Sequence, residues 1–183
     1  MQVITHFMTN KQEKILTTAL ELFATHGFNA VSTNRISKEA KVSEGLIFRH
    51  FSNKKGLLDA ILNQAFERAT HLYADIIVEE DPQKVIHRAI TLPFRVKESE
   101  YHFWRLQFKL KWELNLSGKD KVQPLIEKLA WAFNELHYLE PYKEAQVLEH
   151  IIESISAGVL QDGIETQIAL KNFLLAKYKV YNF

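Results

Sequence analysis

The sequence predicts an all-α protein. Apolar residues recur every three or four positions along most of the 183-residue chain, which is the spacing of one face of a helix. Only 6 Gly and 4 Pro occur, so the breaks between periodic stretches are short. The clear breaks are Gly27, Asp81-Pro82, Ser117-Gly118, Glu140-Pro141 and Asp162-Gly163. Together these observations indicate about nine helices joined by short turns.

The first helix is expected to begin at Thr9 or Asn10 and to end at Gly27. Either of the first two residues can cap the amino end, and Gln12 or Glu13 lies three residues on, where it would complete a capping box. Gly27 suits the left-handed conformation that closes many helices. One apolar face runs along this helix and consists of Ile15, Ala19, Leu22 and Phe23.

Two short helices are predicted next, over 33–40 and 44–51, with only Lys41, Val42 and Ser43 between them. Thr33 and Ser43 stand at their N-cap positions. Helices of about two turns are unstable alone, so packing against the first helix must hold them. The residues available for that packing are Ile36, Ala40, Val42, Ile47 and Phe51.

The rest of the chain predicts six longer helices. A fourth helix begins near Asn53 and runs to about Val78. Beyond Pro82, the periodicity predicts helices over 82–97, 100–116, 122–138, 142–160 and 164–179. Pro93 should kink or end the first of these.

One of these segments is ambiguous. Between Trp104 and Leu116, apolar and polar residues alternate, which is the period of a strand. The run is long for a strand, no neighbouring segment offers a partner, and the intervening Arg, Gln, Lys and Glu favour helix. We therefore predict a helix that is buried on two faces.

Composition excludes several functions. The chain has no Cys, so disulfides, Cys-based zinc sites and iron-sulfur clusters are ruled out. No segment approaches the roughly 18 apolar residues of a membrane span. Catalytic, nucleotide-binding and His-metal motifs such as HExxH, GxGxxG and GxSxG are missing from the sequence. We expect a cytoplasmic, non-enzymatic protein without cofactor, metal or membrane partner.

Charge is distributed unevenly. Residues 1–55 hold eight Lys or Arg against four Glu, a net charge of +4, which leaves −3 for residues 56–183. A basic amino-terminal part on a mildly acidic body is one layout of a DNA-binding protein that carries a second domain.

The stretch VSEGLIFRHF, residues 42–51, predicts an unusual helix surface. With Ile47 at the centre of the buried side, Gly45 and Arg49 point away from the core, and Leu46 and Phe48 flank them. An outward glycine lets a backbone approach another surface closely, and the apolar side chains around it need a cover. The major groove of DNA is a plausible cover.

A family resemblance rests on these residues. The run TNRISKEAKVSEGLIFRHFSNKKGLL, residues 33–58, resembles the helix-turn-helix of TetR-family transcriptional regulators. The matching positions are Thr33, Ile36, Ala40, Val42, Ser43, Gly45, Ile47, Phe48, His50, Phe51 and Lys54. ALELFATHGFNAVS, residues 19–32, is similar to the first helix of the family. The resemblance implies a three-helix helix-turn-helix DNA-binding domain over 1–55 and a larger helical ligand-sensing and dimerisation domain over 56–183.

The resemblance also implies residue roles. Thr33, Phe48, His50 and Lys54 would hold DNA phosphates; Asn34, Glu44, Gly45, Leu46 and Arg49 would meet base edges, and Ser43 completes the DNA-binding set. Three positions depart from the pattern. Lys41 replaces the usual turn Gly, Phe48 replaces Tyr, and Glu44 places a carboxylate near DNA. Glu44 either accepts a hydrogen bond from cytosine or is a solvated charge at a helix start.

The expected function is a sequence-specific regulator, a repressor released by a small, largely apolar ligand. The expected partners are a palindromic operator in double-stranded DNA, an unidentified small-molecule effector and a second copy of the chain. The predicted ligand pocket comprises Phe94, His102, Phe103, Trp104, Phe108, Trp112, Trp131 and Asn134. The predicted dimer interface comprises Leu148, Ile151, Ile152, Ile155, Gly158, Val159, Leu170, Phe173 and Leu174. Two alternatives stay open: the C-terminal apolar face is buried within one chain, or DNA binding is lost and the fold serves as a ligand-binding or interaction module.

Overall fold

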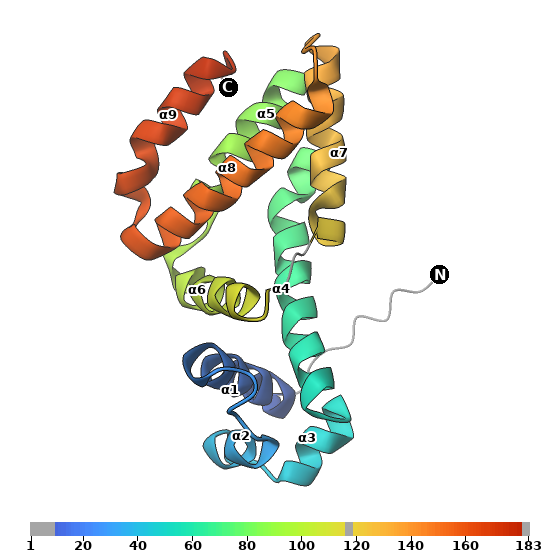
Figure 1. Ribbon diagram of the computed structural model, residues 1–183, viewed down its shortest axis with the longest axis vertical. Helices are drawn as coiled ribbons and strands as arrows, with labels where there is room; N and C mark the ends of the chain where they lie inside the picture. The colour runs from blue at the N-terminus through green and yellow to red at the C-terminus, as the bar shows by residue number, and fades with distance from the viewer. Residues whose placement is uncertain (1–9, 116–118, 181–183) are drawn as a thin grey trace. The chain divides into compact units, whose positions relative to one another are not determined.

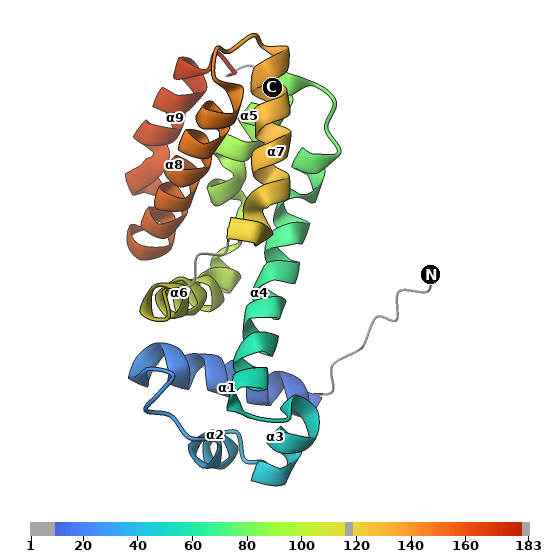
Figure 2. The same cartoon turned by 45° about the vertical axis from the view of Figure 1, so that its right-hand side comes forward.

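The computed structural model describes residues 10–115 and 119–180, and this part of the chain is helical without strands. The described residues form nine α-helices and two short 3-10 helices. The α-helices are labelled in Figures 1 and 2. In chain order these are α1 (Asn10–His26), α2 (Thr33–Glu39), α3 (Glu44–Phe51), α4 (Lys54–Ile77), α5 (Pro82–Thr91), η1 (Leu92–Arg95), α6 (Glu98–Glu113), α7 (Lys119–Glu135), α8 (Pro141–Asp162), η2 (Ile164–Gln167) and α9 (Ile168–Lys177). The prediction of an all-α fold is confirmed.

The chain forms two compact units. Among the described residues, unit 1 holds 10–65 and 106–115, and unit 2 holds 66–105 and 119–180. The division therefore passes through two helices, α4 and α6, each of which contributes residues to both units. The predicted boundary at residues 55 and 56 concerns which residues read DNA, and it stays a prediction.

The core of unit 1 joins α1 to the two short helices. Ile15, Ala19, Phe23, Ile36 and Ile47 have no exposed surface. Gly27 ends α1 with a φ of +87°, as its position predicts, and its amide donates to the Phe23 carbonyl. The capping residue of α2 is Ser32, not Thr33, because the Ser32 hydroxyl accepts from the Arg35 amide. Thr9 lies outside the described residues.

Lys41 carries the strain that its position predicts. It sits in the turn between α2 and α3 with a φ of 54°, in the left-handed region that favours glycine. Its amide donates to the Lys38 carbonyl and the next amide, of Val42, to Ser37, so the turn is held in this conformation.

We expect Lys41→Gly to raise the free energy of unfolding by about 1 kcal/mol, because a Cβ in the left-handed region costs roughly that much. Urea unfolding of the two proteins measures this difference. A matched change at Lys38, an exposed residue within α2, should destabilise instead, since Gly is a poor helix former. A Lys41→Gly protein no more stable than the wild type would contradict the strain.

The core of unit 2 is built by α5, α7, α8 and α9. Its central residues, Val85, Ile86, Leu129, Phe133, Leu148 and Ile155, are fully buried. The Asp81 side chain caps α5, and the α-helix gives way at residues 92–95 to η1, which contains Pro93. The prediction that Pro93 ends its helix is confirmed.

The ambiguous segment is helical, in α6, so the helix interpretation is confirmed over the strand. Its burial on two faces is wrong. Only Gln107 and Leu110 are buried in α6, and Trp112 is 63% exposed. Leu110 and the Gln107 amide, which donates to the Ile61 carbonyl of α4, pack on the same side within unit 1. The opposite apolar stripe of α6, which contains Trp112, stays partly exposed.

A helix that crosses a bilayer needs about 20 mostly apolar residues. None of the described helices combines enough length with enough apolar residues to cross a membrane.

Candidate nucleic-acid interface

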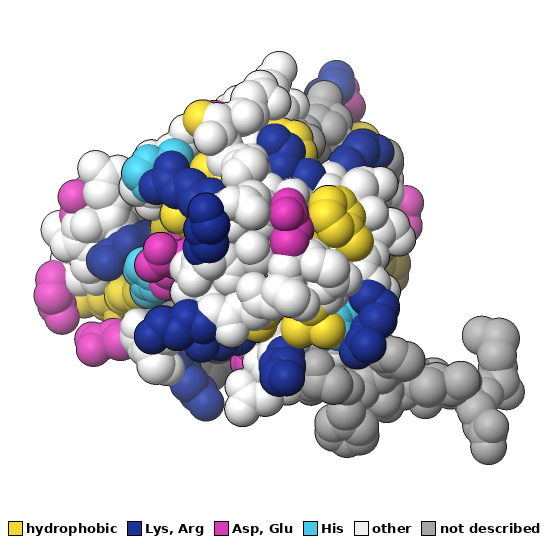
Figure 3. All heavy atoms as spheres, turned by 90° about the horizontal axis from the view of Figure 1, so that it is seen from below, with side chains coloured by type: hydrophobic (Ala, Val, Ile, Leu, Met, Phe, Trp, Pro, Cys, Tyr) yellow, Lys and Arg dark blue, Asp and Glu magenta, His cyan; other side chains and the backbone are white. Residues whose placement is uncertain are grey.

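α3 presents a mixed apolar and basic face on the outside of unit 1. Ile47 is fully buried against the core, and Leu46 is half-buried. Arg49 is exposed, and Phe48 is 46% exposed although it is a large apolar side chain. Figure 3, which views this end of unit 1 from below, shows Lys and Arg side chains spread over the surface with hydrophobic side chains between them. The predicted orientation of α3 is confirmed.

Gly45 leaves this face open at its centre. A Cβ built on Gly45 meets no atom within 4 Å, so the position demands no glycine for packing inside the chain. Glycine inside a helix costs roughly 0.5–1 kcal/mol relative to alanine. A residue that weakens its helix and serves no internal contact is best explained by an external surface that comes close.

Glu44 is tied to the start of α2. Its Oε1 accepts the Thr33 hydroxyl at 2.6 Å, and its Oε2 accepts the Asn34 amide at 3.4 Å. The Glu44 carboxylate is thus hydrogen-bonded to two residues that were themselves expected to contact DNA, and both interpretations of Glu44 stay open. The spacing of 11 residues between Thr33 and Glu44 gave no sequence signal for this pair.

Lys54 makes hydrogen bonds within unit 1 that the sequence analysis did not predict. Its ammonium donates to the carbonyls of Phe28 at 3.0 Å and Val31 at 3.1 Å, and it lies 4.4 Å from the centre of the Phe28 ring. An ammonium has three donors, so two of them are occupied within unit 1. Lys54 thus joins the start of α4 to the segment between α1 and α2, and at most one donor is left for a phosphate.

His50 also has an internal contact. Its Nδ1 lies 3.2 Å from the Gln12 amide nitrogen of α1. Of the residues expected to hold phosphates, Thr33, His50 and Lys54 thus make hydrogen bonds inside unit 1. Such bonds fix the side chains in place, and any phosphate contact has to be added to them or replace them. Ser43 caps α3 by position and makes no side-chain capping bond.

The predicted ligand pocket is brought together only in part. Phe94, Phe103, Trp104 and Trp131 belong to unit 2 and are half-buried. Phe108 and Trp112 belong to unit 1, and Trp112, His102 and Asn134 are exposed. The pocket that these residues were expected to line stays a prediction.

Two buried donors on α6 were not predicted as a pair. The Tyr101 hydroxyl and the Trp104 indole nitrogen are buried without a hydrogen-bond partner in the described part of the chain. Residues three apart share one face of a helix. Burial, together with the Glu98 carboxylate, raises the pKa of Tyr101, so its phenol stays a donor at neutral pH. Unpaired buried donors are costly, and a ligand oxygen would satisfy them.

A charged cavity of about 590 Å³ lies elsewhere in unit 2, lined by Asp75, Lys84, His87, Arg88, Thr91 and Arg95. The Asp75 carboxylate is paired with Arg95 at 2.6 Å, and Arg88 with Glu79 at 2.6 Å. The Arg95 and Arg88 charges lower the pKa of Asp75 against the opposing effect of burial. These ion pairs join α4, α5 and η1, and none of the predicted pocket residues lines this cavity.

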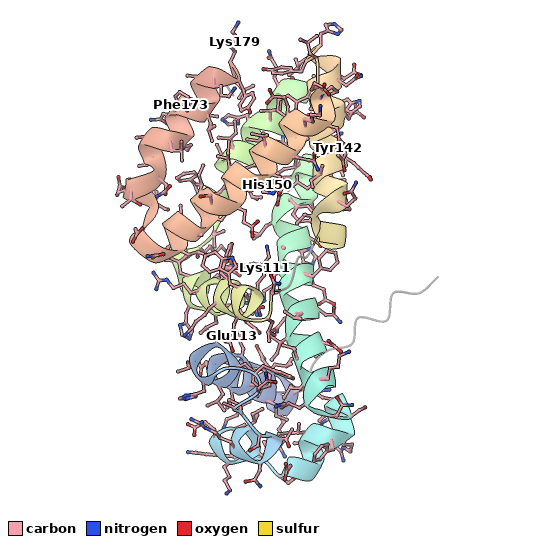
Figure 4. The ribbon with its side chains drawn as sticks, viewed as in Figure 1. Lys111, Glu113, Tyr142, His150, Phe173 and Lys179 are labelled. Atoms are coloured by element: carbon pink, nitrogen blue, oxygen red, sulfur yellow. The ribbon has the colours of Figure 1, made fainter. Side chains whose placement is uncertain are left out.

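The predicted dimer interface divides into core and surface. Leu148, Ile152, Ile155, Val159 and Leu174 are buried in unit 2 itself, and their part in a dimer stays a prediction. Leu170 is 40% exposed, Phe173 (Figure 4) is 62% exposed, and Ile151 is half-exposed. Gly158 faces its own chain, because a Cβ there would lie 2.6 Å from the Gln167 side chain. α7 packs along α8, and α5, η1 and η2 also contact it, so the apolar stripe of α8 is covered within unit 2.

The fold and the site define a helix-turn-helix protein: three helices pack on one small core, and the third carries an open, basic surface. Residues 15–61, which contain all of α2 and α3, match the model of the bacterial regulatory proteins of the tetR family. This part of the chain is therefore similar to the DNA-binding region of TetR-family transcriptional regulators.

Known proteins agree with this assignment. The chain is 28% identical to the HTH-type transcriptional regulator YuxN of Bacillus subtilis over 131 residues, 71% of this chain and 44% of that protein. It is 38% identical to the HTH-type transcriptional repressor Rv3405c of Mycobacterium tuberculosis over 82 residues, 45% of this chain and 42% of that one. The matches thus span less than half the length of these relatives. A solved transcriptional regulator of Saccharomonospora viridis in complex with choline shares the fold, with a TM-score of 0.68 at 19% identity, over 96% of this chain and 98% of that one.

Proposed function

We propose that the protein is a sequence-specific DNA-binding repressor that works as a homodimer on a palindromic operator and is released by a small, largely apolar ligand. It acts by binding and not by catalysis, and its place of action is the cytoplasm, where the DNA is. The observation that carries the proposal is the outward face of α3, with Gly45 open and Leu46, Phe48 and Arg49 around it.

The dimensions of α3 suit a DNA groove. Its 8 residues give a length of roughly 12 Å at 1.5 Å per residue, and the major groove is about 12 Å wide. Gly45 permits close approach of the helix backbone to base edges. Arg49 is exposed and can donate two bonds to a guanine, while Leu46 and Phe48 meet thymine methyl groups or sugars.

One such helix buries too little surface for specific binding, so a dimer is part of the proposal. The exposed apolar residues of the last two helices support it. Val147 and Ile151 lie on α8, and Leu170 and Phe173 on α9. Apolar side chains that remain exposed on neighbouring parts of these helices support a surface that a second copy covers.

Phe173→Asp is expected to shift the protein from dimer to monomer, because burying an unpaired carboxylate in an apolar interface is unfavourable. Sedimentation velocity at micromolar concentration measures the change. Lys177→Asp is a suitable control, since Lys177 is an exposed polar residue on the same helix. A wild-type protein that sediments as a clean monomer would refute the dimer.

Ligand release is supported by unit 2. Tyr101 and Trp104 offer two buried donors, and the same unit holds the half-buried aromatic residues Phe94 and Trp131. Ligand cavities combine apolar walls with a few polar anchors of this kind. A ligand changes DNA affinity only if it binds one conformation better than another. Residues of both units lie on the continuous helices α4 and α6. A conformational change in unit 2 can therefore be transmitted to unit 1 along these helices.

Selection from random duplex DNA tests the proposal as a whole. The wild-type protein should enrich two inverted half-sites about one DNA turn apart. Apolar compounds that carry an oxygen acceptor are then titrated against the selected complex, and an active compound should release the DNA. Failure to enrich any sequence would favour the alternative, a module of this fold that has lost DNA binding.

A further inference from the structure

The contact between Glu44 and the start of α2 has a consequence for sequence discrimination. Glu44 begins α3, and its two carboxylate oxygens accept hydrogen bonds from the Thr33 hydroxyl and the Asn34 amide. The first contact is partly buried at 2.6 Å, and the second is exposed at 3.4 Å. In the DNA complex proposed above, these same two donors face the duplex. The carboxylate and the DNA therefore compete for one hydroxyl and one amide.

This competition affects binding to all DNA sequences in one way and binding to a matching sequence in another. When DNA takes the Thr33 hydroxyl or the Asn34 amide, the Glu44 carboxylate loses its partner and is left beside a polyanion. Every DNA sequence imposes this loss, because phosphates are the same everywhere. Only a base edge that donates a hydrogen bond to Glu44 can replace the bond that the carboxylate has lost. In the major groove, cytosine N4 and adenine N6 are both donors, but the adenine edge also presents the N7 acceptor beside its amino group, so a carboxylate pairs better with cytosine.

We propose that Glu44 is a specificity-determining residue: it holds Thr33 and Asn34 in the free protein, lowers affinity for DNA in general, and regains a partner only where the half-site offers a cytosine. The inference rests on the proposed DNA-binding function and adds the base that one residue reads. Discrimination arises here mainly by penalising wrong sequences, which is a common route to specificity.

Glu44→Gln tests this directly, because glutamine keeps the shape and the hydrogen-bonding oxygen but removes the charge. Two results are expected. First, Kd for a non-cognate duplex should fall about 2- to 5-fold, which is the range of an exposed charge interaction. Second, selection from random duplexes should replace a cytosine found with the wild type by adenine, since glutamine pairs with the N6 and N7 edge of adenine.

A matched control removes the same charge from unit 1 without touching Thr33. Glu39 is exposed at the last position of α2, so Glu39→Gln should leave the selected half-site unchanged. In a Thr33→Val background, Glu44→Gln should tighten non-cognate binding less, because the competition for the hydroxyl is gone. Thermal unfolding confirms that each variant is folded.

The outcomes separate the two proposals. If the wild type enriches no sequence, the DNA-binding function itself fails. If the wild type enriches a site but Glu44→Gln selects the same cytosine, or binds non-cognate DNA no more tightly than the wild type, the role of Glu44 is overturned and the function stands.

Discussion

Gly56→Ala is expected to lower the free energy of unfolding by about 3 kcal/mol, near the upper end of overpacking effects. A Cβ on Gly56 would lie 2.1 Å from the Phe51 carbonyl oxygen, a backbone atom that cannot rotate away. The Gly56 amide also donates to the Asn53 side chain at 2.9 Å, which holds the start of α4 in place. Urea unfolding measures the loss, and because this junction positions α3, DNA affinity should fall with it.

The same substitution at Gly45 is the matched control. Both glycines lie in helices of unit 1, but a Cβ at Gly45 meets nothing within 4 Å. Gly45→Ala should therefore stabilise the protein by about 0.5–1 kcal/mol through helix propensity while weakening DNA binding. Equal losses of stability at the two positions would contradict the packing at Gly56.

Arg49→Ala is expected to weaken binding to the selected operator by about 1–3 kcal/mol and to relax the preference at one base pair, because a bidentate contact to guanine is lost. Titration of the operator and of single-base variants measures both effects. Stability should change little, since Arg49 is exposed.

Arg49→Lys distinguishes a base contact from a phosphate contact. Lysine keeps the charge but lacks the planar fork, so it restores phosphate binding and fails to restore bidentate reading of a base. Wild-type affinity and base preference in both variants would show that α3 does not dock through Arg49.

The helices of unit 1 could be predicted because their signals are local. Gly27, the spacing of Ile15, Ala19 and Phe23, and the short gap between α2 and α3 involve residues within a few positions of each other. The strain at Lys41 followed from the family resemblance, because Lys41 replaces the glycine that is usual at this turn. The outward position of Gly45 could be predicted from the rotation of about 100° per residue, counted from the buried Ile47.

The sites in unit 2 were less accessible to sequence reasoning. Periodicity shows that a stripe of α8 is apolar, but it does not tell whether the same chain or a second copy covers it. Leu148 and Ile155 are covered by their own unit, whereas Phe173 is left exposed. In α6, two apolar stripes were equivalent by pattern, and packing buried Leu110 while it left Trp112 in solvent.

From the order of residues alone, this chain is recognisable as an all-helical protein with an outward, basic third helix, because helix formation and helix faces depend on neighbours three or four positions away. The partners of Glu44, Lys54 and Gln107 are 11, 23 to 26 and 46 residues distant, so they are set only when the helices pack. Packing thus determines which polar groups of the proposed DNA-binding surface already make hydrogen bonds within the free protein.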